Sequence, residues 1–171
     1  KVKKVIVILI VLIFILNISK CYASTENLDI SAESAILIDS SSERVLYSKN
    51  ENEKMYPAST TKILTAILTL ENCKLDDVVT VPYEAIITIP SGYSVAALQT
   101  GEQLTVEQLL KLMMVHSAND AANVLAFHVS GSIENFANLM NNKVSELGLT
   151  NTHFTNPSGI HDVNHYSTAY D

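Results

Sequence analysis

The sequence predicts an α/β fold in which a β-hairpin is followed by a core helix and then by a helical region. Two short apolar runs separated by turn residues, at 35–39 and 45–47, indicate the hairpin. From Ser59 onward the apolar residues recur at the spacing of an α-helix. Capping residues mark the ends of three further amphipathic segments, at 105–114, 120–129 and 132–147. Because no repeat or Pro/Gly-rich linker interrupts residues 34–171, we expect them to belong to one domain.

The hairpin and the first helix follow from local patterns. The apolar run at 35–39 (AILID) predicts a buried strand, residues 40–43 suit a turn, and 45–47 (VLY) predict the returning strand. The first helix is expected to run from Ser59 to about Glu71. Its apolar face consists of Ile63, Leu64, Ala66, Ile67 and Leu70.

Two irregular stretches precede the helical region. Residues 76–81 predict a short extended segment, and 91–100 predict irregular chain that stops at Gly101. Thr105 and Gln108 then have the spacing of a capping box, which indicates a helix start.

The last two helices have clear ends. Gly131 is expected to end the helix at 120–129, since glycine readily adopts the left-handed conformation that closes a helix. Ser132 is expected to cap the next helix, which Gly148 closes. The tail, 151–171, is expected to be a loop because 156–159 (NPSG) is a turn signal.

The first 23 residues have the three parts of a secretory signal peptide. Lys1, Lys3 and Lys4 give a basic start, 5–16 is an unbroken apolar run, and cleavage is expected after Ala23. The alternative is an uncleaved anchor, although twelve apolar residues fall short of the roughly 20 that span a membrane. A lipoprotein site at Cys21 is disfavoured because Lys20 occupies a position expected to be small. We therefore expect an exported, extracytoplasmic protein, with any membrane association through the leader or a segment after Asp171.

The charge balance excludes a basic nucleic-acid binder. Of the 11 basic residues four lie in the leader, which has no acidic residue, so the net charge of −7 becomes −11 for residues 24–171. Such an acidic surface repels phosphate. Without the leader only Cys73 remains, so no intrachain disulfide can form and the fold depends on its apolar core. Cys73 follows an apolar helix and is expected to be a half-buried, inert thiol rather than a nucleophile.

Ser59 and Lys62 are the first candidates for catalysis. Residues three apart share a helix face, so the hydroxyl and the amine can meet. Pro57 predicts an extended entry that places Ser59 at the helix N-terminus, where free N–H groups favour developing negative charge. A lysine in an apolar helix loses solvation, and its neutral form can then act as a base for the hydroxyl. Because this spacing is common by chance, a helix cap followed by a surface lysine is the alternative.

Ser117 and Asn119 lie between two predicted helices, where a short turn can present them to a cleft. The Ser117 hydroxyl could relay a proton between Lys62 and a leaving amine. The Asn119 amide could hold Lys62 and a substrate carbonyl. The alternative is again helix capping, for which Ser and Asn are well suited.

These segments together resemble the penicillin-recognising serine peptidases, and most closely the low-molecular-mass penicillin-binding proteins that are D-alanyl-D-alanine carboxypeptidases. The paired motifs are typical of β-lactamases and penicillin-binding proteins. The similarity extends in one order over everything after about Ser34. It rests on 35–39 (AILID), 57–62 (PASTTK), 101–106 (GEQLTV), 116–122 (HSANDAA), 152–159 (THFTNPSG) and 165–171 (HYSTAYD). Ser158 departs from the bulkier polar residue of many relatives, with no evident mechanistic cost.

The resemblance implies a β-lactamase/transpeptidase-like fold, with a mixed, mainly antiparallel sheet flanked by helices and a helical subdomain carrying Ser117. It also implies that Ser59 attacks the penultimate D-Ala carbonyl of a peptidoglycan stem peptide ending in D-Ala-D-Ala. Lys62 would be the base, Ser117 and Asn119 would belong to the proton relay and substrate clamp, and β-lactams would acylate Ser59. No cofactor is implied.

The family's third motif, a Lys-Thr-Gly-type strand that binds the substrate carboxylate and lines the oxyanion hole, does not occur in the 171 residues. None of the five glycines follows a basic residue and a hydroxyl residue. In relatives this motif comes after the tail segment, so residues 24–171 are expected to be the N-terminal part of a longer domain. Much of the sheet would then be missing, and we expect little activity from this part alone.

Three alternatives remain open at this point. A serine β-lactamase shares Ser-x-x-Lys, although the Glu-x-x-Leu-Asn pentad of the class with a glutamate-activated water is absent. An inert fragment or cell-wall-binding remnant is the non-enzymatic alternative. A zinc site at His161 and His165, four residues apart, is disfavoured because the pair lies in a predicted loop without further ligands.

Overall fold

Residues 29–171 are described by the computed structural model, and the predicted signal peptide lies outside them. Residues 32–171 form one compact unit. Within the described range no helix is both long and apolar enough to cross a membrane.

The predicted hairpin is confirmed. Strand β1 (Ala35–Ile38) pairs antiparallel with β2 (Val45–Lys49), in a register that places Ala35 opposite Lys49. Asp39 fixes the connecting turn, since its Oδ1 accepts bonds from the hydroxyl and backbone N–H groups of Ser41 and Ser42. These bonds, led by the Ser41 hydroxyl, lower the pKa of Asp39 to about 2.

The predicted burial of the first strand is wrong for the structure. Leu37 is 50% exposed and Ile38 is 43% exposed. Within residues 29–171, β1 pairs only with β2, so the strand pair forms a small sheet of its own. An apolar run becomes buried only where another element covers it.

The first helix forms, with a tighter start than predicted, but its predicted apolar face is not its buried face. Ile63 is 55% exposed, Ile67 is 44% exposed and Leu70 is 54% exposed. A 3₁₀ turn, η1 (Ala58–Thr61), leads directly into α2 (Lys62–Asn72). Thr65, Leu68 and Thr69 lie on the buried side of α2. The predicted extended segment forms β3 (Val78–Thr80), which pairs antiparallel with β4 (Gln103–Thr105).

The sequence analysis missed α3 (Tyr83–Ile87) and β4. A five-residue helix and a three-residue strand are too short to show a period of 3.6 or 2 residues. Strand β4 exists because it pairs with β3, a partner some 25 residues away in the chain.

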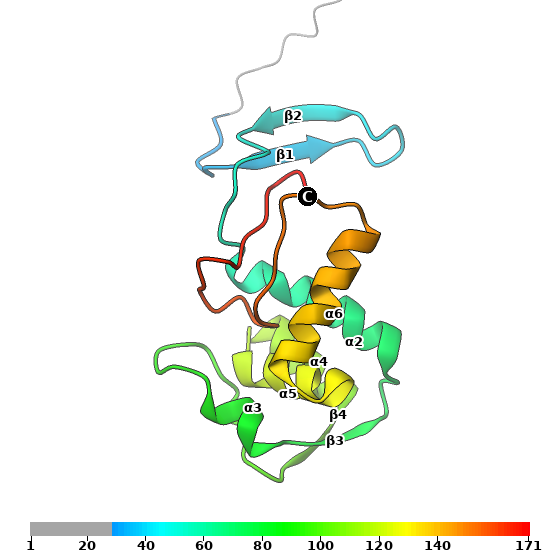
Figure 1. The fold of residues 1–171 in the computed structure, drawn as a ribbon, viewed down its shortest axis with the longest axis vertical. Coiled ribbons are helices and arrows are strands. Elements are labelled where there is room, and N and C mark those ends of the chain that lie inside the picture. The colour runs from blue at the N-terminus through cyan, green and yellow to red at the C-terminus, as the bar shows by residue number, and fades with distance from the viewer. Residues whose placement is uncertain (1–28) are drawn as a thin grey trace, which may run out of the picture. The chain divides into compact units, whose positions relative to one another are not determined.

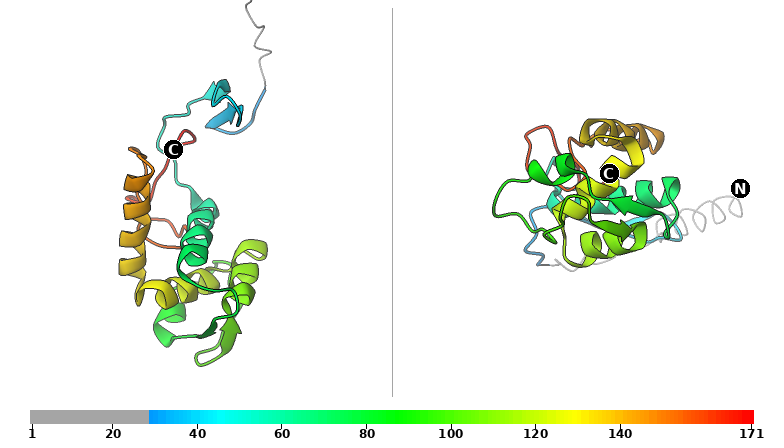
Figure 2. Two further views of the ribbon diagram at one scale, coloured as in Figure 1. Left: turned by 90° about the vertical axis from the view of Figure 1, so that its right-hand side faces the viewer. Right: turned by 90° about the horizontal axis from the view of Figure 1, so that it is seen from below.

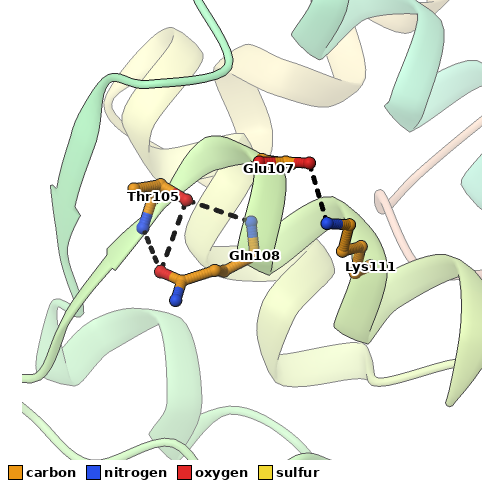
Figure 3. A network of polar contacts seen from close by, with 4 residues as sticks. All are labelled: Thr105, Glu107, Gln108 and Lys111. Carbon is orange, nitrogen blue, oxygen red and sulfur yellow. Dashed lines mark hydrogen bonds and ion pairs between the residues drawn. The ribbon is translucent and has the colours of Figure 1, made fainter.

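The helical region has the predicted caps. Helix α4 (Val106–Val115) begins with the capping box shown in Figure 3, where Thr105 Oγ1 accepts from the Gln108 backbone N–H at 3.2 Å. The Gln108 side-chain oxygen in turn accepts from the Thr105 backbone N–H at 2.8 Å. Glu107 and Lys111 form an exposed ion pair on the same helix (Figure 3).

The next two helices also end as predicted. Helix α5 (Asn119–Ser130) closes at Gly131, whose φ is 80°. Ser132 caps α6 (Ile133–Glu146) by accepting a bond from the Asn135 N–H at 3.1 Å.

Helix α5 is the centre of the core, and every residue from Asn119 to Ala126 is buried. Figures 1 and 2 show α2, α3, α4 and α6 grouped around it, and each of these helices packs against α5. The tail after α6 runs back beside the start of η1, where Met55 and Ser167 pair through their backbones (Figure 1). The tail contains no helix or regular strand, as predicted.

Candidate active site

Ser59 and Lys62 meet at the junction of η1 and α2. Pro57 does not form the predicted extended entry, because its φ and ψ are −70° and −15°, and Ala58 follows with a left-handed φ of 47°. Ser59 is exposed in the 3₁₀ turn, whereas Lys62, three residues later, is only 2% exposed. The turn therefore presents a hydroxyl to solvent above a buried amine.

The buried amine of Lys62 has three oxygen partners and no carboxylate. Nζ lies 3.1 Å from Ser59 Oγ, 2.8 Å from Asn119 Oδ1 and 2.7 Å from the Ser158 carbonyl oxygen. In the described part of the chain no acidic side chain forms an ion pair with Lys62. Burial lowers the pKa of Lys62 to about 8, because removal from water disfavours the charged form.

Ser117 and Asn119 approach the pair from the α4–α5 connection. Ser117 has a left-handed φ of 55°, and its hydroxyl donates to Ser59 Oγ at 2.9 Å. Asn119 begins α5, and its Nδ2 donates to the Ser94 carbonyl at 2.9 Å, which directs Oδ1 at Lys62. All four residues singled out in the sequence are thus brought together. Contact of the Asn119 amide with a substrate carbonyl stays a prediction.

The tail supplies site groups that the sequence analysis missed. The Ser158 backbone carbonyl accepts the bond from Lys62, and the Pro157 carbonyl accepts one from Thr65 at 2.6 Å. Asn156 Oδ1 accepts from the N–H groups of the next residues, including Gly159 at 2.8 Å, and so shapes this loop. The NPSG pattern predicted a turn, but no sequence signal marks a backbone carbonyl as a lysine partner.

Gly159 lets the tail pack closely against η1, the turn that contains Ser59. Its φ is 84°, and a Cβ built on it would overlap the carbonyl of Ala58. Only glycine allows the backbone of the tail to approach Ala58 this closely. The close approach holds the tail against the residue that precedes Ser59.

The buried side chain of His165 contacts Thr61, the last residue of the η1 turn that carries Ser59. Its Nε2 lies 2.8 Å from Thr61 Oγ1, and its Nδ1 accepts from the Thr155 N–H at 3.1 Å. Burial lowers the pKa of His165 to about 4, so the ring is neutral at neutral pH. His161 instead lies against the Tyr56 ring, with ring centroids 4.6 Å apart. The two histidines thus have different partners.

The arrangement can carry out nucleophilic chemistry. A neutral Lys62 amine can take the proton of the Ser59 hydroxyl, which makes the oxygen a nucleophile. Ser117 offers a second hydroxyl through which a proton can move to or from the same oxygen. The site itself contains no cluster of metal-ligating side chains among the described residues.

The chain matches known proteins over most of its length. Residues 21–171 match peptidase family S11, described as D-alanyl-D-alanine carboxypeptidase. The D-alanyl-D-alanine carboxypeptidase DacF of Bacillus subtilis is 43% identical over 152 residues, which are 86% of this chain and 38% of DacF. DacC of Escherichia coli is 41% identical, over 83% of this chain and 38% of DacC. The chain thus spans about two fifths of the length of these relatives.

Solved structures agree on the fold. Penicillin-binding protein 5 from Haemophilus influenzae is similar with a TM-score of 0.76 and 36% identity, over 82% of this chain and 42% of that one. Penicillin-binding protein 6B from Escherichia coli is similar with a TM-score of 0.79 and 31% identity, over 87% of this chain and 50% of that one. The predicted β-lactamase/transpeptidase-like fold, which is that of the penicillin-binding proteins, is confirmed. The chain belongs to the D-alanyl-D-alanine carboxypeptidase family of peptidases.

Proposed function

We propose that this chain provides the nucleophile, the base and the proton relay of a serine D-Ala-D-Ala carboxypeptidase. The observation that carries the proposal is the 3.1 Å contact between Ser59 Oγ and a Lys62 amine that is buried and has no carboxylate partner in the described residues. A surface lysine after a helix cap would be exposed and charged. Membership of the carboxypeptidase family supports the same reaction.

In the acylation step Ser59 Oγ attacks the carbonyl carbon of the penultimate D-Ala, and the hydroxyl proton moves to Lys62 Nζ. The tetrahedral intermediate then expels the terminal D-Ala, whose nitrogen takes up a proton through the Ser117 hydroxyl. Water next attacks the acyl-enzyme: its oxygen bonds to the acyl carbon, the bond to Ser59 Oγ breaks, and one of the water protons passes to Ser59 Oγ as the shortened peptide leaves. A β-lactam would acylate the same oxygen, but its leaving nitrogen stays attached to the acyl group.

The substrate class follows from the family and from the predicted export. The stem peptides of peptidoglycan end in D-Ala-D-Ala and lie outside the cytoplasmic membrane. A signal peptide at 1–23 would take the protein there. We therefore place the reaction in the synthesis and remodelling of the cell wall.

Residues 24–171 by themselves are inferred to have little activity. A carboxylate clamp and the second half of the oxyanion hole would come from a Lys-Thr-Gly element, which these residues do not contain. Preorganised donors at an oxyanion are worth about 10²- to 10³-fold each in rate. The proposed carboxypeptidase activity is therefore expected only when a Lys-Thr-Gly element is joined to residues 24–171.

A chimaera tests the proposal directly. In this DacF chimaera, the part of the chain that matches Bacillus subtilis DacF replaces the corresponding segment of DacF. Thermal unfolding first establishes that the chimaera is folded. We then expect it to bind a fluorescent penicillin covalently and to release D-Ala from a D-Ala-D-Ala peptide. Ser59→Ala should abolish both, and Ser145→Ala, an exposed serine on α6, should change neither. Labelling that persists in Ser59→Ala would contradict the proposal.

Two further readouts separate the alternatives. Slow release of the bound penicillin supports a carboxypeptidase, and rapid turnover would indicate a β-lactamase. Weak labelling of the 171-residue chain alone supports its inferred inactivity, and rapid stoichiometric labelling at Ser59 would contradict that inference while leaving the role of Ser59 intact.

A further inference from the structure

A group of side chains that are common metal ligands lies at the far ends of the two helices that hold the site. Lys62 and Asn119 are the first residues of α2 and α5, and their side chains are joined by a bond of 2.8 Å. Cys73 directly follows the last residue of α2, and His128 lies in the last turn of α5. The two helices therefore run in the same direction, with the catalytic candidates at one end and Cys73 and His128 at the other.

Asp77 completes this group from the turn that connects α2 to β3. One potential ligand atom from each of Cys73, Asp77 and His128 lies within 4.8 Å of the other two. Cys73 and Asp77 are half-buried, and His128 is exposed. It is the one such group found among the described residues.

The Asp77 carboxylate is held in place by its own turn. Its Oδ2 accepts from the Lys74 backbone N–H at 2.8 Å, and the Asp77 N–H donates to the Lys74 carbonyl at 3.2 Å. The closed turn fixes one carboxylate oxygen and leaves the other available as a ligand. Cys73 is fixed as well, because its backbone N–H bonds to the Thr69 carbonyl at 2.9 Å.

We propose that Cys73, Asp77 and His128 bind one zinc ion. Thiolate, imidazole and carboxylate are the three ligand types that zinc takes in proteins, whereas calcium and magnesium prefer oxygen alone. Zinc–ligand bonds of about 2.0 to 2.3 Å place tetrahedral ligand atoms roughly 3.3 to 3.7 Å apart. Because the three atoms already lie within 4.8 Å of one another, each pair closes by no more than about 1.5 Å on binding, through rotation of the Cys73 and His128 side chains toward the Asp77 carboxylate.

Zinc binding requires the thiol to lose its proton. The Cys73 S–H bond breaks, the sulfur bonds to the metal, and the proton leaves to solvent. A water molecule takes the fourth position.

The bound metal would cross-link the end of α2 to the end of α5, and we call this cross-link the clip. The three ligands come from the end of α2, the turn after it and the end of α5, so they converge only in the folded chain. Metal binding therefore stabilises the folded state. The clip would hold the far ends of the helices whose near ends carry Lys62 and Asn119. It does not depend on the proposed peptidase function.

Cobalt provides a direct test, because Co²⁺ substitutes for Zn²⁺ and gives a thiolate charge-transfer band when a cysteine binds it. The 171-residue chain is used with Cys21→Ser, which leaves Cys73 as its single thiol. We expect one equivalent of Co²⁺ to produce the band, Zn²⁺ to displace it, and Zn²⁺ to raise the temperature of thermal unfolding. Cys73→Ser should remove the band.

The remaining variants distinguish a site formed by all three residues from metal binding by the Cys73 thiol only. His128→Gln changes an exposed side chain and should weaken Co²⁺ binding at least tenfold, as should Asp77→Asn, while Asp76→Asn is the matched control and should leave it unchanged. Absence of the band with excess Co²⁺ would overturn the proposal. So would equal affinity in the parent chain, His128→Gln and Asp77→Asn.

Discussion

Nζ of Lys62 lies 3.1 Å from Oγ of Ser59, and the two groups have opposite environments. Ser59 is exposed on a 3₁₀ turn, and Lys62 is 2% exposed beneath it. Asn119 and the Ser158 carbonyl supply the remaining partners of the amine. A buried lysine with a pKa lowered to about 8, next to an accessible hydroxyl, is the feature from which the proposed chemistry follows.

The acylation rate should depend on the protonation state of Lys62. Its pKa is lowered from 10.5 to about 8, and only the neutral amine can accept the Ser59 proton. The rate of penicillin acylation of the DacF chimaera should therefore rise with pH and reach half its maximum near pH 8. Stopped-flow fluorescence with a labelled penicillin measures this profile.

Two variants control this prediction. Lys62→Arg keeps a positive charge that cannot be lost, and should reduce acylation by about 10²- to 10⁴-fold at every pH. Asn119→Asp places a carboxylate beside the amine, which favours the charged form and should shift the profile to higher pH. An unchanged profile in Asn119→Asp would contradict the assignment of this pH dependence to Lys62.

The Ser117 hydroxyl should be required for turnover, whereas the Ser117 side chain should not be required for the stability of the fold. Its φ of 55° is a conformation that glycine adopts at lower cost, so Ser117→Gly should be as stable as the parent chain or more stable. The variant removes the hydroxyl that donates to Ser59 at 2.9 Å and should slow turnover by about 10²- to 10⁴-fold. Thermal unfolding and D-Ala release of the chimaera give the two readouts. Full turnover in Ser117→Gly would rule out the relay.

Gly159→Ala should destabilise the chain more than a comparable substitution elsewhere. The new methyl group would overlap the Ala58 carbonyl, which adds roughly 1–3 kcal/mol to the about 1–2 kcal/mol cost of a left-handed alanine. Gly92→Ala is the control, since Gly92 has a φ of 92° and open space around its Cβ position. Urea unfolding of the 171-residue chain compares the two variants, and equal losses would contradict the close approach.

His165 should make the chain less stable in mild acid. Its pKa is lowered from 6.5 to about 4 in the fold, so between these values the unfolded state binds more protons. The free energy of unfolding should therefore fall as the pH drops from about 6.5 to 4, by no more than about 3 kcal/mol. Urea unfolding across this range should show a smaller dependence in His165→Gln. His116→Gln, at an exposed histidine that does not act on His165, should keep the parent dependence, and an equal change in both variants would contradict the assignment.

The sequence predicts those parts of the fold whose cause is local. The Thr105–Gln108 capping box and the Gly131 helix end depend on neighbouring residues, and both form as expected. The exposure of β1 could not be predicted, because it depends on which elements cover the strand. Helix α3 and strand β4 were missed because they are short.

The candidate site divides in the same way. Ser59 and Lys62 share a helical face, and that contact is a matter of spacing alone. The Ser158 carbonyl bonds to Lys62 across 96 positions, and every residue type has such a carbonyl. His165 bonds to Thr61 across 104 positions. The left-handed Ala58 and its contact with Gly159 likewise depend on tertiary structure, which a local pattern does not encode.

The most direct test of the central claim is to locate the penicillin adduct in the DacF chimaera by peptide mass spectrometry. The account predicts one adduct for each molecule, on the peptide that contains Ser59, and its loss in Ser59→Ala. An adduct on any other residue, or an unchanged yield of adduct in Ser59→Ala, would contradict it.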